Sequence, residues 1–201
     1  MMLDTRYSGS TCVSVMTLGR KLYMANVGDS RGIVIRSTPN PNGADPATCV
    51  DCTALTRDHK PDDKDEADRI IANGGRIDSF RDQNNNPLGP LRVWLMNEDV
   101  PGLAMTRSFG DSVSHSVGCN AIPEMGEYTF TKDDKIVVIA SDGVWEFLEN
   151  IDVARIVYPL YLQKNAEGAA ENLVRASFKR WRKEESVVDD ITCIVIFLDV
   201  K

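Results

Sequence analysis

Short runs of hydrophobic residues, several of them separated by turn residues, predict that much of this chain forms β-strands. An alternating run at residues 11–18 and a second run at residues 21–27 flank a Gly-Arg pair and predict a hairpin, and residues 32–36 predict a further short strand. The run at residues 135–141 is apolar without interruption, which predicts a strand covered on both faces. Residues 191–200 predict a last strand that is also apolar on both faces.

Helical patterns lie between these runs of strands. The first predicted helix has Asp63 and Glu66 in the spacing of a capping box at its start, and the Gly-Gly pair at residues 74–75 ends it. The second begins at residue 150 or 152 and continues through residue 157. The third has one apolar face. The residues of this face are Ala166, Ala170, Leu173, Val174, Ser177 and Trp181.

The order of these elements predicts the fold class. Strands come in runs with helices between the runs, and this favours an α+β fold with antiparallel sheets over a doubly wound α/β fold. Polar, Pro- and Asn-rich stretches at residues 37–49 and 81–90 predict surface loops, and the chain after Gly110 is irregular. Because no internal repeat or change of composition divides the chain, we interpret residues 1–201 as part of one domain.

Composition and charge narrow the possible functions. The 201 residues are 42% hydrophobic and 26% charged, as in soluble globular proteins. A net charge of -7 argues against nucleic-acid and membrane partners, and no run is long and apolar enough to span a bilayer. The first ten residues have no apolar signal core, and the five cysteines are an odd count scattered through apolar runs. We therefore expect a cytoplasmic or nuclear protein with reduced thiols.

Aspartates occur where predicted strands begin or end. Asp29 follows the strand at residues 21–27, Asp142 follows the buried strand at residues 135–141, and Asp189-Asp190 precedes the last strand. Carboxylates at strand ends can converge on one rim of a sheet, where a hard divalent cation such as Mg²⁺ or Mn²⁺ offsets their repulsion. The alternative interpretation is local turn chemistry, because Asp beside Gly and Ser is common in turns.

Five segments, in order, resemble the motifs of type 2C metal-dependent Ser/Thr protein phosphatases. The first combines Gly9-Ser10-Thr11 with the Asn-x-Gly-Asp-Ser-Arg signature at residues 26–31. The other four are Leu-Thr-Arg-Asp-His-Lys-Pro at 55–61, Gly-Leu-Ala-Met-Thr-Arg-Ser-Phe-Gly-Asp at 102–111, Ala-Ser-Asp-Gly-Val-Trp-Glu at 140–146 and Asp-Asp-Ile-Thr at 189–192. The segments span nearly the whole chain. The insertion from Val93-Trp94-Leu95 to Pro101-Gly102 resembles plant and protist members more than animal ones. The resemblance implies an αββα sandwich of two mainly antiparallel sheets flanked by helices.

The resemblance also assigns a two-metal centre. It implies that Asp142, with Gly143 behind it, and Asp189 are ligands of two Mg²⁺ or Mn²⁺ ions. Asp190 stands where the family usually has Asn, so either Asp189 or Asp190 is the ligand, and we favour Asp189 from its place in the motif.

A third, weaker metal and a flap that varies between members are further implications of the family. Asp29 is similar to the aspartate that holds the third metal, and Glu146 stands where that site often has Asp. Residues 112–122 correspond to the flap, with Asp111 before it. Arg107 either braces the flap or makes a structural ion pair.

By this resemblance, two metal ions activate a water for attack on phosphoserine or phosphothreonine in phosphoprotein substrates, and the complete enzyme is expected to be a monomer. Ahead of the Gly-Ser-Thr block, family members also have an Arg that binds phosphate and an Asp-Gly-His-Gly-Gly motif. The motif is absent ahead of Gly9, and Arg6 is too close to Gly9 to take the place of the family's Arg. The expectation is therefore a domain incomplete at its N-terminus, with no catalytic residue in this chain. His59 and His115 are the only histidines and are not expected to replace the family's acid. The alternative function is a non-catalytic, pseudophosphatase-type module that binds proteins.

Overall fold

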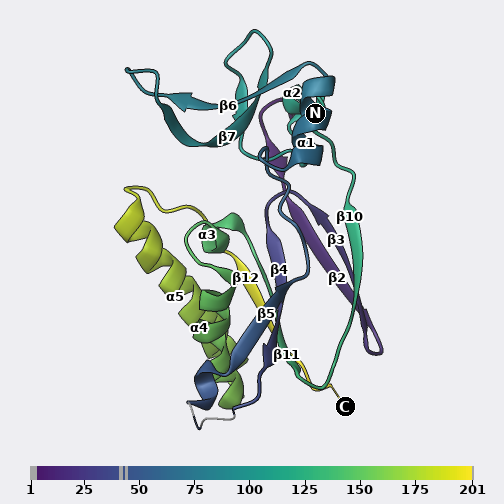
Figure 1. Ribbon diagram of the computed structural model, residues 1–201, viewed down its shortest axis with the longest axis vertical. Coiled ribbons are helices and arrows are strands. Elements are labelled where there is room, and N and C mark those ends of the chain that lie inside the picture. Colours follow the sequence, from purple (N-terminus) through teal and green to yellow (C-terminus); the bar gives the residue numbers. More distant parts are fainter. Residues whose placement is uncertain (1–3, 41–42, 44, 201) are drawn as a thin grey trace. The chain divides into compact units, whose positions relative to one another are not determined.

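The computed structural model describes residues 4–40, 43 and 45–200, so residues 1–3 of the N-terminal segment and residues 41, 42 and 44 of the predicted loop at 37–49 lie outside the described part. The chain forms two compact units (Figure 1). The first unit contains Met1–Cys12, Asn26–Asp29 and Asp58–Glu124. The second unit contains Val13–Ala25, Ser30–Arg57 and Met125–Lys201.

A four-stranded antiparallel sheet forms the centre of the second unit. Its strand order is β12-β11-β4-β5. The strands are β4 (Arg31–Ser37), β5 (Val50–Ala54), β11 (Asp134–Ala140) and β12 (Cys193–Phe197). The short 3-10 helix η1 (Pro46–Thr48) precedes β5. The uninterrupted apolar run of β11 lies between two neighbouring strands and is covered on both faces, which confirms that prediction.

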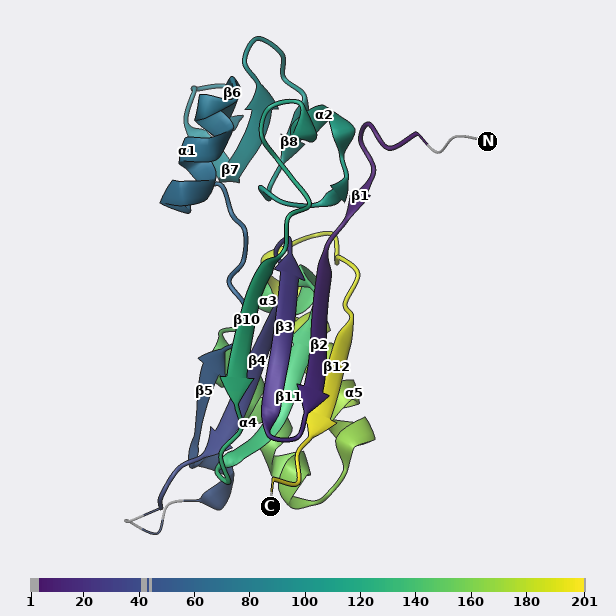
Figure 2. The same cartoon turned by 90° about the vertical axis from the view of Figure 1, so that its right-hand side faces the viewer.

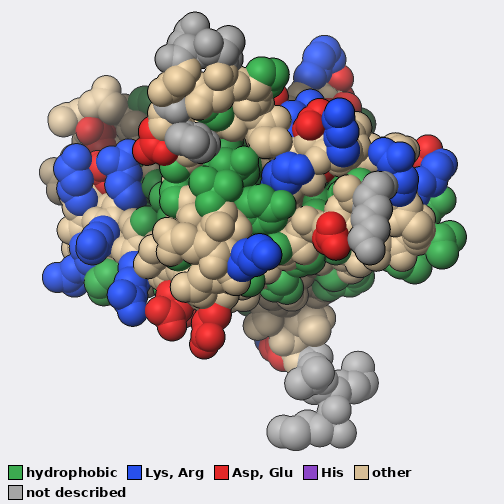
Figure 3. Space-filling model, turned by 90° about the horizontal axis from the view of Figure 1, so that it is seen from below, with side chains coloured by type: hydrophobic (Ala, Val, Ile, Leu, Met, Phe, Trp, Pro, Cys, Tyr) green, Lys and Arg blue, Asp and Glu red, His purple; other side chains and the backbone are tan. Residues whose placement is uncertain are grey.

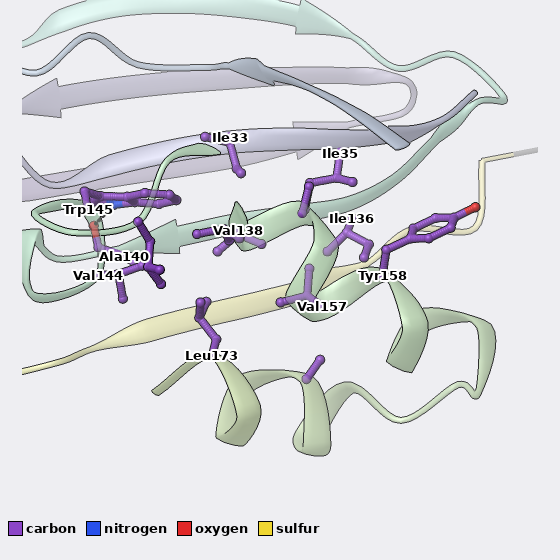
Figure 4. Close-up of a cluster of buried hydrophobic side chains, with 14 residues drawn as sticks. Ile33, Ile35, Ile136, Val138, Ala140, Val144, Trp145, Val157, Tyr158 and Leu173 are labelled. Carbon is purple, nitrogen blue, oxygen red and sulfur yellow. Dashed lines mark hydrogen bonds between the residues drawn. The ribbon is translucent and has the colours of Figure 1, made fainter. Parts of the chain in front are cut away.

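Three helices follow β11 in the second unit: α3 (Asp142–Trp145), α4 (Asn150–Leu162) and α5 (Ala166–Glu184). Helix α4 begins where the sequence predicts, but it continues beyond residue 157 and includes Pro159. Helices α4 and α5 cover one face of the four-stranded sheet, and their apolar side chains meet those of the strands (Figure 4). Val157 and Leu173 are fully buried in this core, as are Ile33 and Val138 of the sheet.

A second sheet, with strand order β10-β3-β2, packs against the other face. Its strands are β2 (Cys12–Leu18), β3 (Lys21–Val27) and β10 (Glu124–Thr129), and Figure 2 shows them in front of the four-stranded sheet. Leu22 and Met24 of β3 meet Val34 and Val137 in a second core. The predicted hairpin is therefore confirmed, and so is the predicted packing of two antiparallel sheets, with α4 and α5 outside the four-stranded sheet.

Several large hydrophobic side chains of these strands remain exposed. They are Met16, Leu18, Met125, Ile194 and Ile196. Hydrophobic side chains also reach the surface in the view of Figure 3. The prediction that the last strand is covered on both faces is wrong, because Ile194 is 55% exposed while its neighbours Cys193 and Val195 pack against the core. The strand is also shorter than the predicted residues 191–200.

The first unit is built around α1 (Lys64–Ala72) and a three-stranded sheet in the order β6-β7-β8. These strands are β6 (Gly75–Arg81), β7 (Pro87–Leu95) and β8 (Pro101–Leu103), and a two-stranded ladder joins β1 (Gly9–Ser10) to β9 (Phe109–Gly110). A four-residue helix, α2 (Ser112–His115), follows β9. The predicted loop at 81–90 is partly wrong, because residues 87–90 belong to β7.

Helix α1 begins and ends as predicted, but its predicted capping box does not form. Asp63 is the N-cap residue and makes no side-chain capping hydrogen bond. Glu66 is fully buried and binds two arginines instead. At the other end, Gly74 has φ of 79°, the left-handed conformation that favours glycine after a helix. None of the helices in the described residues is long and apolar enough to cross a membrane.

Candidate metal-binding site

The pairing of β11 with β12 brings two of the predicted ligand segments to the same end of the four-stranded sheet. The strands pair antiparallel as far as Ala140 and Cys193. Just beyond, the N–H of Ser141 donates to the carbonyl oxygen of Thr192 at 3.0 Å, and the N–H of Thr192 donates to Ser141 Oγ at 3.1 Å. Asp142 follows this junction along the chain and residues 189–190 precede it. The two acidic segments therefore lie at one rim of the second unit.

Gly143 allows the two segments to approach closely. A Cβ added at this position would lie only 2.3 Å from the carbonyl oxygen of Asp190. The Oγ of Ser141 donates to the same carbonyl at 3.3 Å. The indole Nε1 of Trp181 in α5 also donates to this turn, at the carbonyl oxygen of Gly143, at 2.7 Å. The turn that carries Asp142 is therefore held between the 189–192 segment and α5.

Asp189 and Asp190 are both exposed, but they make different contacts. The backbone N–H of Asp190 donates to Asp189 Oδ1 at 2.7 Å, which orients the Asp189 carboxylate. Asp190 contributes its backbone carbonyl to the junction with Ser141 and Gly143. The side chain of Asp189 is therefore the one that local hydrogen bonding orients.

Glu146 lies one helical turn beyond Asp142. Its N–H donates to the carbonyl oxygen of Asp142 at 2.8 Å, and its side chain is exposed. Residues four apart on a helical turn lie on the same side. Glu146 is thus placed to add a carboxylate on the side of Asp142.

The donor chemistry of this rim suits a hard divalent cation. Asp142, Glu146, Asp189 and Asp190 offer carboxylate and carbonyl oxygens, the ligands that Mg²⁺ and Mn²⁺ prefer. However, across residues 4–40, 43 and 45–200, no group of three or more His, Cys, Asp or Glu side chains is arranged to hold a metal ion. The described rim thus fits part of a metal site.

Asp29 belongs to the first unit and has a different environment. It is 3% exposed, and Lys60 Nζ donates a short hydrogen bond to its carboxylate. His59 holds the preceding residue, because its Nδ1 accepts from the N–H of Gly28 at 3.0 Å and its own N–H donates to the Gly28 carbonyl at 3.1 Å. His59 and Lys60 thus position the Asp29 loop, in keeping with a structural role for this histidine.

Arg107 shares a buried carboxylate with Arg69. The two oxygens of Glu66 accept hydrogen bonds from Arg69 at 2.9 and 2.8 Å. Arg107 donates to the same carboxylate from Nη2 at 2.6 Å, and the hydroxyl of Thr106 also donates to it. Burial raises the pKa of Glu66, but the hydrogen bonds from Arg69, Arg107 and Thr106 outweigh burial and hold the pKa far below its usual value.

These two arginines also donate hydrogen bonds to the backbone of the predicted flap at residues 112–122. Arg107 Nη1 donates to the carbonyl oxygen of Ile122 at 2.9 Å, and Arg69 Nε donates to that of Gly118 at 2.8 Å. One guanidinium of Arg107 thus makes an ion pair with Glu66 and also contacts the end of the predicted flap segment.

Asp111 and His115 contribute to the structure at the start of the same segment. Asp111 is buried and left-handed, with φ of 43°, and a Cβ added to Gly9 would lie 1.8 Å from its carboxylate. A ring nitrogen of His115, Nε2, donates to the carbonyl oxygen of Ser108 at 2.9 Å. These contacts join the β1–β9 ladder to α2 and favour a structural role for Asp111.

The sequence alone did not identify the residues that hold the proposed site residues in place. Trp181 appears in the sequence only as one member of an apolar helix face, and Lys60 only as part of a motif. Glu66 carries a sequence signal for a helix cap, while two of its partners, Thr106 and Arg107, lie about 40 residues further along the chain. A signal for these contacts would require knowing which segments meet in space.

The sequence matches one protein-family model and is similar to curated plant proteins. The family model for Protein phosphatase 2C matches residues 2–185. "Probable protein phosphatase 2C 64" of Oryza sativa subsp. japonica is 39% identical over 203 residues, which cover 99% of this chain and 44% of the relative. "Probable protein phosphatase 2C 52" of Arabidopsis thaliana is 37% identical over 99% of this chain and 40% of its own length. The chain thus spans less than half of these two curated relatives.

Solved structures agree on the fold. The crystal structure of serine-threonine phosphatase 2C from Toxoplasma gondii matches with a TM-score of 0.79 at 23% identity, over 96% of this chain and 60% of that chain. The structure of a C. elegans sex determining protein matches with a TM-score of 0.66 at 21% identity, over 93% of this chain and 39% of that chain.

Proposed function

This chain belongs to the protein phosphatase 2C family, and we propose that it forms part of a metal-dependent phosphatase that hydrolyses phosphoserine and phosphothreonine in proteins. The observation that carries the proposal is the rim of the second unit, where Ser141–Thr192 hydrogen bonds bring Asp142 and Asp189 to one end of the sheet. The oxygen donors there match a magnesium or manganese enzyme.

Each residue of the rim has a proposed role. Asp142 and Asp189 would each supply a carboxylate to two Mg²⁺ or Mn²⁺ ions, and Gly143 would let the two segments approach. When bound, such ions lower the pKa of a water molecule and offset negative charge on phosphoryl oxygens. The chain's own contribution is to hold the two carboxylates in register through the β11–β12 junction.

Residues other than these 201 would complete the site. The family's Asp-Gly-His-Gly-Gly motif does not occur in residues 1–201, and the rim by itself lacks a full set of metal ligands. We therefore place the remaining ligands, the phosphate-binding Arg and the general acid outside this sequence. Residues 1–201 would then be part of a single catalytic domain, with residues 112–122 as its flap.

A third cation would have to compete with an ion pair. Asp29 and Glu146 are the residues proposed for that site from the family resemblance. Lys60 already provides a positive charge to Asp29. A third metal at Asp29 would therefore bind weakly, because it must displace the lysine ammonium.

The proposed substrates are phosphoproteins, and the proposed location is the cytoplasm or nucleus. All five cysteines are among the described residues and none of them forms a disulfide there, which suits a reducing compartment. The negative net charge supports partners other than nucleic acid or membrane, and we expect the complete protein to act as a monomer.

The deciding experiment is Mn²⁺-dependent hydrolysis of a phosphothreonine peptide, with the 201-residue chain and with a longer chain that carries the family's upstream motif. In the longer chain, Asp142→Asn should lower the rate at least about 100-fold, because it removes a metal ligand. Asp199→Asn is the matched control, since Asp199 is exposed beyond the far end of β12 and its substitution should leave the rate unchanged. Equal activity of the wild-type and Asp142→Asn chains would refute the proposal, and a folded longer chain without turnover would instead indicate a binding module.

A further inference from the structure

The second half of α5 carries a concentration of positive charge that the proposed mechanism does not use. Residues 175–183 contain five cationic side chains and no acidic one, in a chain whose net charge is -7. The five are Arg175, Lys179, Arg180, Arg182 and Lys183. All of them are exposed, whereas Ser177 and Trp181 of the same turns face the protein interior.

This segment lies beside the rim that carries Asp142. Trp181 bonds to the Gly143 carbonyl at 2.7 Å, and its ring contacts that of Phe147 edge to face at 4.7 Å. Arg180 Nε donates to the Phe147 carbonyl at 3.4 Å. Helix α5 ends at Glu184, and Asp189 follows five residues later. The C-terminal end of α5 therefore contacts the turn that carries Asp142, and the chain reaches Asp189 shortly after this helix ends.

Ion pairs leave much of this charge available. Arg180 and Lys183 reach Glu184 only at 4.0 and 3.9 Å, at exposed positions where such pairs contribute little. Lys179 and Arg182 have no ion pair with any described residue of the chain.

The helix dipole explains only part of the cluster. Positive side chains stabilise the C-terminal end of a helix, but this effect is confined to the last turn. That turn contains Arg182 and Lys183. Lys179 and Arg180 lie before the last turn, so the helix dipole does not account for their positive charge.

We propose that the basic end of α5, defined as Lys179, Arg180, Arg182 and Lys183, binds acidic side chains that flank the phosphorylated residue of the protein substrate. This inference rests on the proposed function, because the rim is where the phosphorylated residue would bind. An acidic protein repels acidic substrates at long range, and a local positive surface beside the site reverses that repulsion. The basic end thus selects phosphoproteins with Asp or Glu near the phosphorylation site.

Peptide binding in the presence of EDTA tests this inference separately from turnover. Two fluorescein-labelled phosphothreonine peptides are compared by anisotropy at low salt, one with glutamates and one with glutamines around the phosphothreonine. The wild-type chain should bind the glutamate peptide at least about threefold more tightly, and raising the salt to about 0.2 M should weaken this preference. Lys179→Glu and Lys183→Glu should each abolish the preference.

Lys132→Glu is the matched control. Lys132 is exposed in the turn before β11, at the opposite end of that strand from Asp142, so this variant has the same charge change away from the rim. It should keep the preference. Equal binding of the two peptides, no binding of either, an equal loss in Lys132→Glu, or binding of anionic vesicles in place of the glutamate peptide would each overturn the inference. Mn²⁺-dependent hydrolysis of both peptides without a preference, by the longer chain that carries the upstream motif, would leave the proposed function intact.

Discussion

The indole nitrogen of Trp181 donates a hydrogen bond to the carbonyl oxygen of Gly143, at a distance of 2.7 Å. This bond ties α5 to the turn that presents Asp142, and Gly143 in turn lies against the backbone of Asp190. The turn at Gly143 thus meets two segments, at Trp181 and Asp190, that lie 38 or more residues further along the chain. The geometry of the proposed metal ligands depends on this packing as well as on the ligands themselves.

Trp181→Phe should weaken metal binding as well as stability. The phenyl ring keeps most of the packing but leaves the Gly143 carbonyl without this donor, which should cost about 1–3 kcal/mol in the free energy of unfolding. Urea unfolding measures the loss of stability, and Mn²⁺ titration of the longer chain that carries the upstream motif measures the loss of metal affinity. Trp94→Phe is the control, because Trp94 Nε1 donates to the carbonyl of Asp78 at 2.9 Å in the first unit. A similar loss of Mn²⁺ affinity in both variants would contradict a specific role for Trp181.

Gly143→Ala should disturb the rim directly. The new Cβ would lie 2.3 Å from a backbone oxygen of Asp190, and backbone cannot move aside as a flexible side chain does. We expect a loss of about 1–3 kcal/mol in the free energy of unfolding, measured in urea. Gly32→Ala is the control in the same unit, since its nearest neighbours would lie at an ordinary 3.8 Å. A Gly143→Ala chain as stable as the Gly32→Ala chain would show that this close approach is absent.

Glu66→Gln should destabilise the protein strongly at neutral pH. The substitution leaves Arg69 and Arg107 without the buried charge that both bind, and breaking such a pair typically costs about 3–5 kcal/mol. Urea unfolding at pH 7 measures the loss, with the exposed Glu98→Gln as a control expected to lie within about 0.5 kcal/mol of wild type. A Glu66→Gln chain with wild-type stability would refute this role.

Glu66 should also make stability depend on pH in the acid range. Its folded-state pKa lies below the usual value, so the unfolded chain takes up the proton first as pH falls. The stabilisation is therefore complete above the ordinary glutamate pKa of about 4.3 and decreases below it. The slope of unfolding free energy against pH below that value should be smaller in Glu66→Gln than in wild type and in Glu98→Gln. Equal slopes in all three chains would contradict the assignment.

The sequence was informative where strands pair in a simple way. Asp142 after β11 and Asp189 before β12 could be predicted to converge, because neighbouring antiparallel strands place the end of one beside the start of the next. The β6–β7 hairpin was not predicted, because the residues around its turn are polar and the first five residues of β7 are exposed. Without a buried face, such a strand has no alternating hydrophobic signal.

Long-range polar contacts were the other part that the sequence did not reveal. Asp63 and Glu66 have the spacing of a capping box, but the energy of pairing Glu66 with two arginines exceeds that of a cap. Residue spacing reports local geometry only, so a partner 41 residues away is invisible to it. The ion pair between Lys60 and Asp29, which are 31 residues apart, could not be predicted for the same reason.

Lys60→Met should destabilise the first unit and change how Asp29 responds to metal. Removing the ammonium leaves the buried carboxylate without the cation that now offsets its charge, which should cost about 3 kcal/mol in urea unfolding. Millimolar Mn²⁺ should restore part of this loss if Asp29 then takes up a cation in place of lysine. The double variant Asp29→Asn/Lys60→Met is the control, because it removes both charges and should be more stable than Lys60→Met and insensitive to Mn²⁺. Equal Mn²⁺ responses in the single and double variants would show that Asp29 does not bind metal.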